Sequence, residues 1–147
     1  MTMVAPVQLS STTYDADSIS SVQELYHSNG WTDGLPIVPP TADAVQACLE
    51  WAMMPPDQLI GIEPVRGAAI TAEKLAINAV MAGCLPMHFP VVVTAWMAMM
   101  RDEFLMHGAT ASTGGCAVLV VLKVLSAASS AHQAPSMPWA TATAPRP

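Results

Sequence analysis

The stretch TAEKLAINAVMAG, from Thr71 to Gly83, decides the fold that this 147-residue sequence predicts. Thr71 is a suitable N-cap, Gly83 supplies a stop, and the residues between them are apolar on nearly every face apart from Glu73, Lys74 and Asn78. A helix that is hydrophobic all round usually lies at the centre of a domain. We therefore expect this stretch to form a core helix against which the other elements pack.

Helical patterns also stand on both sides of the core helix. Ser20 or Ser21 is placed to cap a short amphipathic helix that stops at Gly30, and Thr41 to cap a second helix. Pro90 suits the first turn of a helix that runs to about residues 101–102. Three apolar runs predict strands, the last of them buried: Ile37–Val38, Leu59–Ile62 and Cys116–Leu122.

These elements predict an α/β domain of about four helices with a small sheet, with an α+β arrangement as the alternative. Residues 1–17 lack periodicity and are expected to form a flexible arm before a single domain over residues 18–125. Residues 126–147 consist mainly of Ala, Ser, Thr and Pro. Such a segment buries too little apolar area to offset the entropy of ordering it, so we expect a disordered tail.

Composition narrows the class of partner. The net charge is −6 and the five basic residues are scattered, whereas a nucleic-acid binder needs a clustered basic face, so we expect no nucleic acid. No charge occurs between Leu75 and Met100, but Pro86, His88 and Pro90 divide this span into two short pieces, so we expect no membrane segment. Only 11% of residues are charged, which predicts extensive burial and a homo-oligomer.

The cysteines and the first residues point to a reducing compartment. Cys48, Cys84 and Cys116 form no CxxC pair, which fits neither a disulfide framework nor a zinc site, so no metal is expected. No basic residue precedes Arg66, so the amino terminus lacks the basic region of a secretory signal. We therefore expect a cytoplasmic protein with free thiols.

Two longer strings carry a resemblance to a known family. They are GWTDGLPIVPPT at residues 30–41 and AINAVMAGC at residues 76–84; Glu73-Lys74 and the LMHG string at residues 105–108 accompany them. Together they resemble bacterial UGSC-type (seleno)proteins, also labelled thioredoxin-like proteins, over about residues 20–122. The resemblance implies the amino-terminal domain of a small-molecule-metabolising enzyme.

The chain departs from that family in two places. No Cys-Gly-Ser-Cys string occurs, so the redox motif of the family has no counterpart here. Lys123-Val124-Leu125 stands where the family has an Asn-Gly-Pro turn, and the composition changes afterwards. We therefore expect a truncated or frame-shifted copy.

Four residues are candidates for catalysis. Cys84 follows the core helix, and His107 precedes a loop rich in small residues, where a titrating imidazole is placed to activate a thiol. We expect both side chains in one cleft, with Glu73 and Lys74 beside them. The alternatives are an inert packed cysteine, a histidine bonded to its own loop, and a polar helix edge that faces solvent.

Four further residues are candidates for substrate binding: Trp31, Asp33, Asn78 and Thr113. Asp33 has an alternative role, the fixing of its own Asp-Gly turn. The sequence predicts small-molecule chemistry, thiol-based if Cys84 is reactive, and indicates no particular cofactor. A non-catalytic binding or oligomerisation domain, or a nonfunctional copy, is the alternative.

Overall fold

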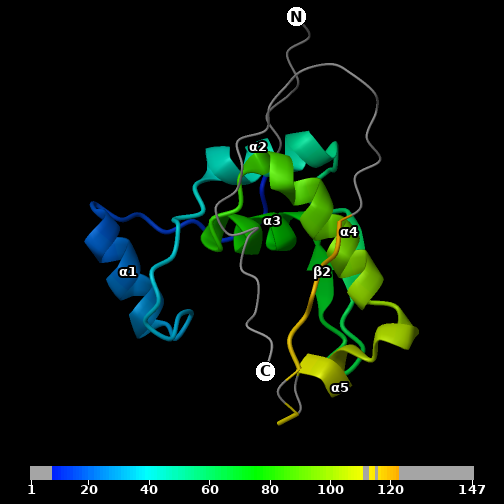
Figure 1. Ribbon diagram of the computed structural model, residues 1–147. Coiled ribbons are helices and arrows are strands. Elements are labelled where there is room, and N and C mark those ends of the chain that lie inside the picture. The colour runs from blue at the N-terminus through cyan, green and yellow to red at the C-terminus, as the bar shows by residue number, and fades with distance from the viewer. Residues whose placement is uncertain (1–7, 111–112, 115, 123–147) are drawn as a thin grey trace, which may run out of the picture.

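The computed structural model describes residues 8–110, 113, 114 and 116–122. These residues form an α+β domain with five α-helices, two short 3-10 helices and a two-stranded antiparallel sheet (Figure 1). In chain order the elements are α1 Ile19–Ser28, α2 Ala42–Ala52, β1 Leu59–Ile62, β2 Ala69–Thr71, α3 Ala72–Met81, η1 Pro86–His88, α4 Phe89–Met99, η2 Asp102–Phe104 and α5 Met106–Thr110.

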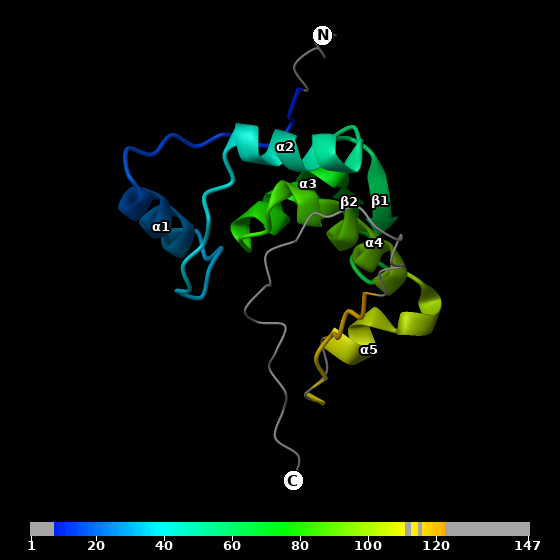
Figure 2. The ribbon, with the colours of Figure 1, turned by 45° about the horizontal axis from the view of Figure 1, so that its top comes forward.

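The hydrophobic core lies where α2, α3 and α4 contact one another. Helix α3 contributes most to it, since six of its ten residues are buried, which confirms the core helix predicted from its sequence. Phe89, at the start of α4, is fully buried, and Leu49 of α2 is nearly so. Figure 2 shows these three helices gathered on one side of the molecule, with α1 standing apart.

The β1–β2 hairpin positions the first turn of α3. Thr71 is both the last residue of β2 and the N-cap of α3, where its hydroxyl accepts the backbone N–H of Lys74 at 3.4 Å. The two amides before that of Lys74 find acceptors in the segment before β1: Ala72 N donates to Gln58 O, and Glu73 N donates to Pro56 O. The start of α3 is thus fixed by backbone contacts on several sides.

The hairpin also meets the end of α4 at a close approach. A Cβ atom placed on Gly61 would lie 3.1 Å from Cγ of Met100, so a larger residue here would require the Met100 side chain to shift. The β1–β2 pairing is irregular between Leu59 and Gly61. The absence of a side chain at Gly61 therefore lets β1 and the C-terminal end of α4 approach each other closely.

Several predicted boundaries change in the structure. The N-cap of α1 is Ser18, whose hydroxyl accepts the amide of Ser21 at 3.1 Å, so the cap lies two or three residues before the predicted one. Helix α4 begins at Phe89 rather than Pro90, which leaves the proline in the first turn as expected. Strand β2 was not predicted, since its three residues are too few to show an alternation.

Two of the predicted strands are wrong. Residues 37 and 38 are extended but belong to no sheet; the Ile37 carbonyl accepts from Gln23 Nε2, and Val38 N donates to Met81 O. Residues 116–122 are irregular and exposed, with Leu119 at 83% and Val121 at 80% accessible. The hydrophobic run suits a buried strand, but no strand among the described residues pairs with it to form a ladder.

The two ends of the chain differ in what the structure describes. Residues 8–17, within the predicted flexible arm, are mostly without regular secondary structure, yet Ser10 and Ser11 are hydrogen-bonded to α3. The predicted tail over residues 126–147 lies outside the described residues. Along the described part of the chain, no helix combines the length and the apolar character needed to cross a membrane.

Candidate functional site

The larger of two described cavities lies between α1 and the α2–α3 pair and has a volume of about 820 Å³. Its walls come from residues 9–16, α1, the turn after α1, the start of α2 and one side of α3. Figures 1 and 2 both show α1 separated from the helical cluster and joined to it by extended segments. The cavity therefore combines segments that are distant in the sequence.

Aromatic rings form one end of this cavity. Trp31 packs against Tyr14 and against Tyr26, with ring centroids 5.4 and 5.3 Å apart and interplanar angles of 70° and 78°. The turn GWTDG at residues 30–34 holds Trp31 in place, since the Trp31 amide donates to the Tyr26 carbonyl at 2.9 Å. All three rings line the cavity, as do Leu25 and Ile77.

Glu73 also lines the cavity and is only 2% exposed. Its carboxylate accepts the Ser10 amide at 3.0 and 3.1 Å, the Ser10 hydroxyl at 2.7 Å and the Ser11 amide at 2.8 Å. Burial raises the pKa of this carboxyl, but the hydrogen bonds from Ser11 and Ser10 outweigh burial and leave the pKa below its usual range. Glu73 is therefore an ionised anchor for residues 8–16.

The other two polar residues of α3 point elsewhere. Lys74 is exposed, and its ammonium donates to the Ala69 carbonyl at 3.4 Å. Asn78 lines the cavity; its amide nitrogen donates to the Lys74 carbonyl at 2.8 Å, which leaves the amide oxygen available to a ligand. The polar edge of the helix thus divides: Glu73 faces inward, Asn78 borders the cavity and Lys74 lies outside it.

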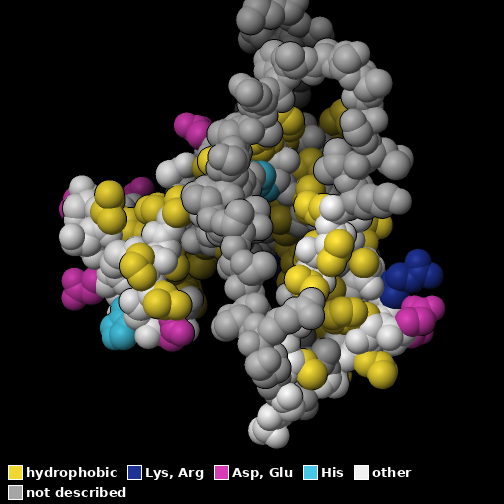
Figure 3. Space-filling model, in the orientation of Figure 1, with side chains coloured by type: hydrophobic (Ala, Val, Ile, Leu, Met, Phe, Trp, Pro, Cys, Tyr) yellow, Lys and Arg dark blue, Asp and Glu magenta, His cyan; other side chains and the backbone are white. Residues whose placement is uncertain are grey.

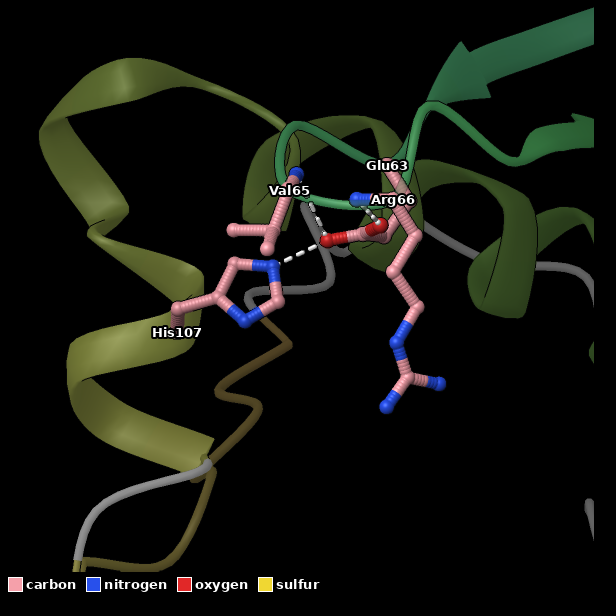
Figure 4. A network of polar contacts seen from close by, with 4 residues as sticks. All are labelled: Glu63, Val65, Arg66 and His107. Carbon is pink, nitrogen blue, oxygen red and sulfur yellow. Dashed lines mark hydrogen bonds and ion pairs between the residues drawn. The ribbon is translucent and has the colours of Figure 1, made fainter.

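A second, smaller cavity of about 370 Å³ lies beside α5 and includes His107. The His107 Nε2 atom is hydrogen-bonded to Glu63, whose carboxylate also accepts the amides of Val65 and Arg66 (Figure 4). The Val65 amide does most to lower the pKa of the Glu63 carboxyl; burial opposes it, and the Arg66 amide and His107 reinforce it. This network ties α5 to the hairpin loop.

Cys84 lines neither cavity, and His107 lines only the smaller one. Cys84 packs against the hydrophobic core, and its amide donates to the Ala79 carbonyl at 2.9 Å. Burial raises the pKa of the neighbouring Cys48 thiol, and the electrostatic interaction with Cys84 raises it further. His107 is instead engaged with Glu63. The structure therefore places the predicted thiol and the predicted base in separate surroundings.

Asp33 and Thr113 also line neither of the two cavities. The Asp33 carboxylate accepts the Leu35 amide at 3.3 Å, so this residue fixes its own turn, as the alternative reading of the sequence holds. Among the predicted residues, the larger cavity brings together Trp31, Glu73 and Asn78.

Residues that the sequence did not indicate complete the cavity. Tyr14 and Tyr26 are the only tyrosines of the chain, and both line it, so their rarity was a usable signal. Ser10 and Ser11 bind Glu73 across more than 60 positions, a pairing that no local pattern reveals. Glu63 was likewise missed as the partner of His107.

Comparisons of the chain with family models, with curated proteins and with solved structures found no match. Among the described residues, no three His, Cys, Asp or Glu side chains are grouped so that they could hold a metal ion.

Proposed function

We propose that this chain is a small-molecule-binding domain whose ligand occupies the cavity between α1 and the α2–α3 pair. The observation that carries the proposal is the cavity itself: about 820 Å³, with aromatic and aliphatic walls and a few polar groups. Small-molecule sites in proteins have this range of volume and this mixture of walls. The polar groups available to a ligand are hydroxyl and amide groups such as those of Thr12, Thr41 and Asn78.

The polar chemistry of the cavity favours binding over catalysis. Its carboxylate, Glu73, already accepts from three donors, and because the Ser10 amide is shared by both oxygens each oxygen has two contacts. A general base needs an acceptor free to take the substrate proton. The thiol of Cys84 and the imidazole of His107 lie outside this cavity.

Thiol-based metabolism of the ligand, and membership of the UGSC-type family, stay predictions. A reactive Cys84 would be alkylated by iodoacetamide well below the ordinary pH range of a thiol. Cys116 is exposed and Cys48 is buried, so the two provide an accessible and a protected reference in the same chain. Labelling of Cys84 no faster than that of Cys116 across pH 5–9 would remove the thiol hypothesis.

We also propose that the domain works in a reducing compartment such as the cytoplasm and as a homo-oligomer. The free Cys48, Cys84 and Cys116 support the first proposal. The second is supported by the exposed apolar side chains of residues 118–122, since large apolar patches mark interaction sites. Sedimentation of the full chain tests the oligomeric state directly.

Ligand-detected NMR with a library of small metabolites tests the binding function. Asn78→Trp places an indole at the mouth of the cavity and is expected to weaken every specific hit at least about tenfold, a loss of roughly 1.4 kcal/mol. Lys74→Trp is the matched control, because Lys74 is exposed on the same helix and lines neither cavity. Hits that both variants bind equally, or a library without hits, would contradict the proposal.

A further inference from the structure

The aromatic end of the larger cavity has the features of a cation site. Trp31 meets Tyr14 and Tyr26 at steep angles, and all three rings line the same space. Trp31 is 45% and Tyr14 52% exposed, so both residues keep accessible surface that a ligand in this space can contact. Ring faces carry negative electrostatic potential, and Trp provides the strongest attraction for a cation.

A buried negative charge on the same cavity has no cationic partner among the described residues. Glu73 is 2% exposed and ionised, yet its hydrogen bonds all come from the neutral groups of Ser10 and Ser11. Buried charges in proteins are normally paired with an opposite charge. The nearest basic residue in sequence, Lys74, directs its ammonium to the Ala69 carbonyl.

The surrounding charges act in the same direction. From Gln8 to Val65 the chain carries no Lys or Arg, and Asp15, Asp17 and Glu24 are adjacent in sequence to residues that line the cavity. Figure 3 shows acidic side chains around the α1 lobe and no Lys or Arg side chain on its visible face. A cleft lined by charge of one sign raises the local concentration of ligands of opposite charge.

The hydrogen bonding of Glu73 distinguishes between kinds of cation. A primary ammonium group or a metal ion needs free lone pairs, and the contacts from Ser10 and Ser11 occupy those of Glu73. A quaternary ammonium group has no N–H to donate. Aromatic faces and an unpaired negative charge suit such a group, and aromatic enclosures are a general means of recognising it.

We propose that the ligand of this cavity is a small molecule with a methylated, permanently charged ammonium group, held against Trp31, Tyr14 and Tyr26 and attracted by the Glu73 charge. This inference rests on the proposed binding function and specifies its ligand class. Asn78 and the nearby hydroxyl groups are available for a polar end of the same molecule.

Choline and its uncharged isostere 3,3-dimethylbutan-1-ol provide the test. The two compounds share shape and hydroxyl group and differ in the charge. We expect choline to bind the full chain about five- to thirtyfold more tightly, the range that corresponds to a cation–π contribution of roughly 1–2 kcal/mol. Titrations followed by NMR at low ionic strength, where screening is weak, give both dissociation constants.

Variants of Trp31 identify the site. Trp31→Leu is expected to abolish the preference for choline, and Trp31→Phe to retain part of it. Trp51→Leu is the control, since Trp51 is exposed on α2 and lines neither cavity. Circular dichroism melting curves of all three variants show whether the fold persists.

The outcomes separate this inference from the proposed function. Equal binding of the two compounds, or a choline preference that survives Trp31→Leu, overturns the cation inference and leaves small-molecule binding standing. Binding of neither compound also overturns the inference, and the metabolite library then decides the proposed function by itself.

Discussion

Helices α1 and α3 have the same length, ten residues, but they are held in the molecule by different forces. Six residues of α3 are buried, whereas α1 has no buried residue. Helix α1 is instead held by half-buried side chains such as Leu25 and Tyr26 and by the Gln23 side chain, which donates to the Ile37 carbonyl at 3.1 Å. Burial of apolar side chains therefore stabilises α3, whereas α1 is held by half-buried side chains and a polar contact.

This contrast assigns different tasks to the two regions. Full burial of a large apolar side chain stabilises a fold by about 1.5–3 kcal/mol, so the α2–α3–α4 core holds most of the stability. A region with few buried contacts opens at low free energy. Because α1 forms a wall of the larger cavity, a ligand that filled the proposed site would supply the packing that α1 lacks and would stabilise α1 by mass action.

Truncation of one large side chain in each region produces the largest expected difference. Phe89→Ala removes a fully buried ring from the core and is expected to lower the free energy of unfolding by about 3–5 kcal/mol. Leu25→Ala, on half-buried α1, is expected to cost roughly 1 kcal/mol, well below the range for fully buried leucines. Urea unfolding measures both. Equal losses would mean that α1 belongs to the same packed unit as α3.

The hydrogen bonds of Glu73, which hold residues 8–16 against α3, give the next largest effect. Glu73→Gln keeps the size of the side chain but removes its charge and one acceptor oxygen, and we expect a loss of about 1–3 kcal/mol. Proteolysis within residues 8–16 should accelerate, since Ser10 and Ser11 lose their partner. Glu50→Gln is the control, because Glu50 is exposed and its carboxylate accepts only the Gln46 side-chain amide among the described contacts.

The lowered pKa of Glu73 also predicts how the stability of the chain changes with pH. The pKa of Glu73 is lowered in the folded state, so the unfolded state binds the proton more tightly. Its stabilising contribution is complete above the ordinary carboxyl pKa and is lost as the pH falls through the lowered one. The stability of Glu73→Gln should therefore approach that of the original chain in acid. A gap that stays constant down to pH 3 would contradict the role of the charge.

The sequence predicted the core region far better than the α1 region. Periodicity and capping identified α2 and α3, because each satisfies its needs locally: a threonine cap, an apolar face and a stop such as Gly83 with a φ of +82°. The Val-rich run over residues 116–122 was misassigned for the opposite reason. A strand exists only if a neighbour pairs with it, and no pattern within the run shows whether one does.

The candidate site was predicted only in part, for the same reason. Trp31 and Asn78 were found because each is unusual in its local surroundings, a tryptophan in a turn and a polar residue on an apolar helix. Glu73 was noticed on similar grounds, but its role was not, because its partners lie more than 60 positions away. Contacts of that range depend on tertiary packing, which local spacing does not encode.

Removal of a helix cap is expected to have the smallest effect on stability, and it compares α1 directly with α3. Ser18 caps α1 and accepts the Ser21 amide at 3.1 Å, while Thr71 caps α3 and accepts the Lys74 amide at 3.4 Å. Local geometry alone predicts that Ser18→Ala costs at least as much as Thr71→Ala, since its bond is the shorter. Because α3 is buried in the core and α1 is not, we expect the reverse: Thr71→Ala costs more than Ser18→Ala.

Loss of a cap in the core region must lower the free energy of global unfolding, because α3 unfolds only with the core. We expect about 1 kcal/mol for Thr71→Ala, and the same for Thr41→Ala at the start of α2, which also controls for the position of Thr71 in β2. Ser18→Ala should change global stability by only a few tenths of a kcal/mol, because α1 frays before the core unfolds. Its effect should appear as faster hydrogen exchange of the α1 amides alone. If Ser18→Ala lowered global stability as much as Thr41→Ala, α1 would unfold together with the core, and a ligand in the larger cavity would have no loosely held wall to stabilise.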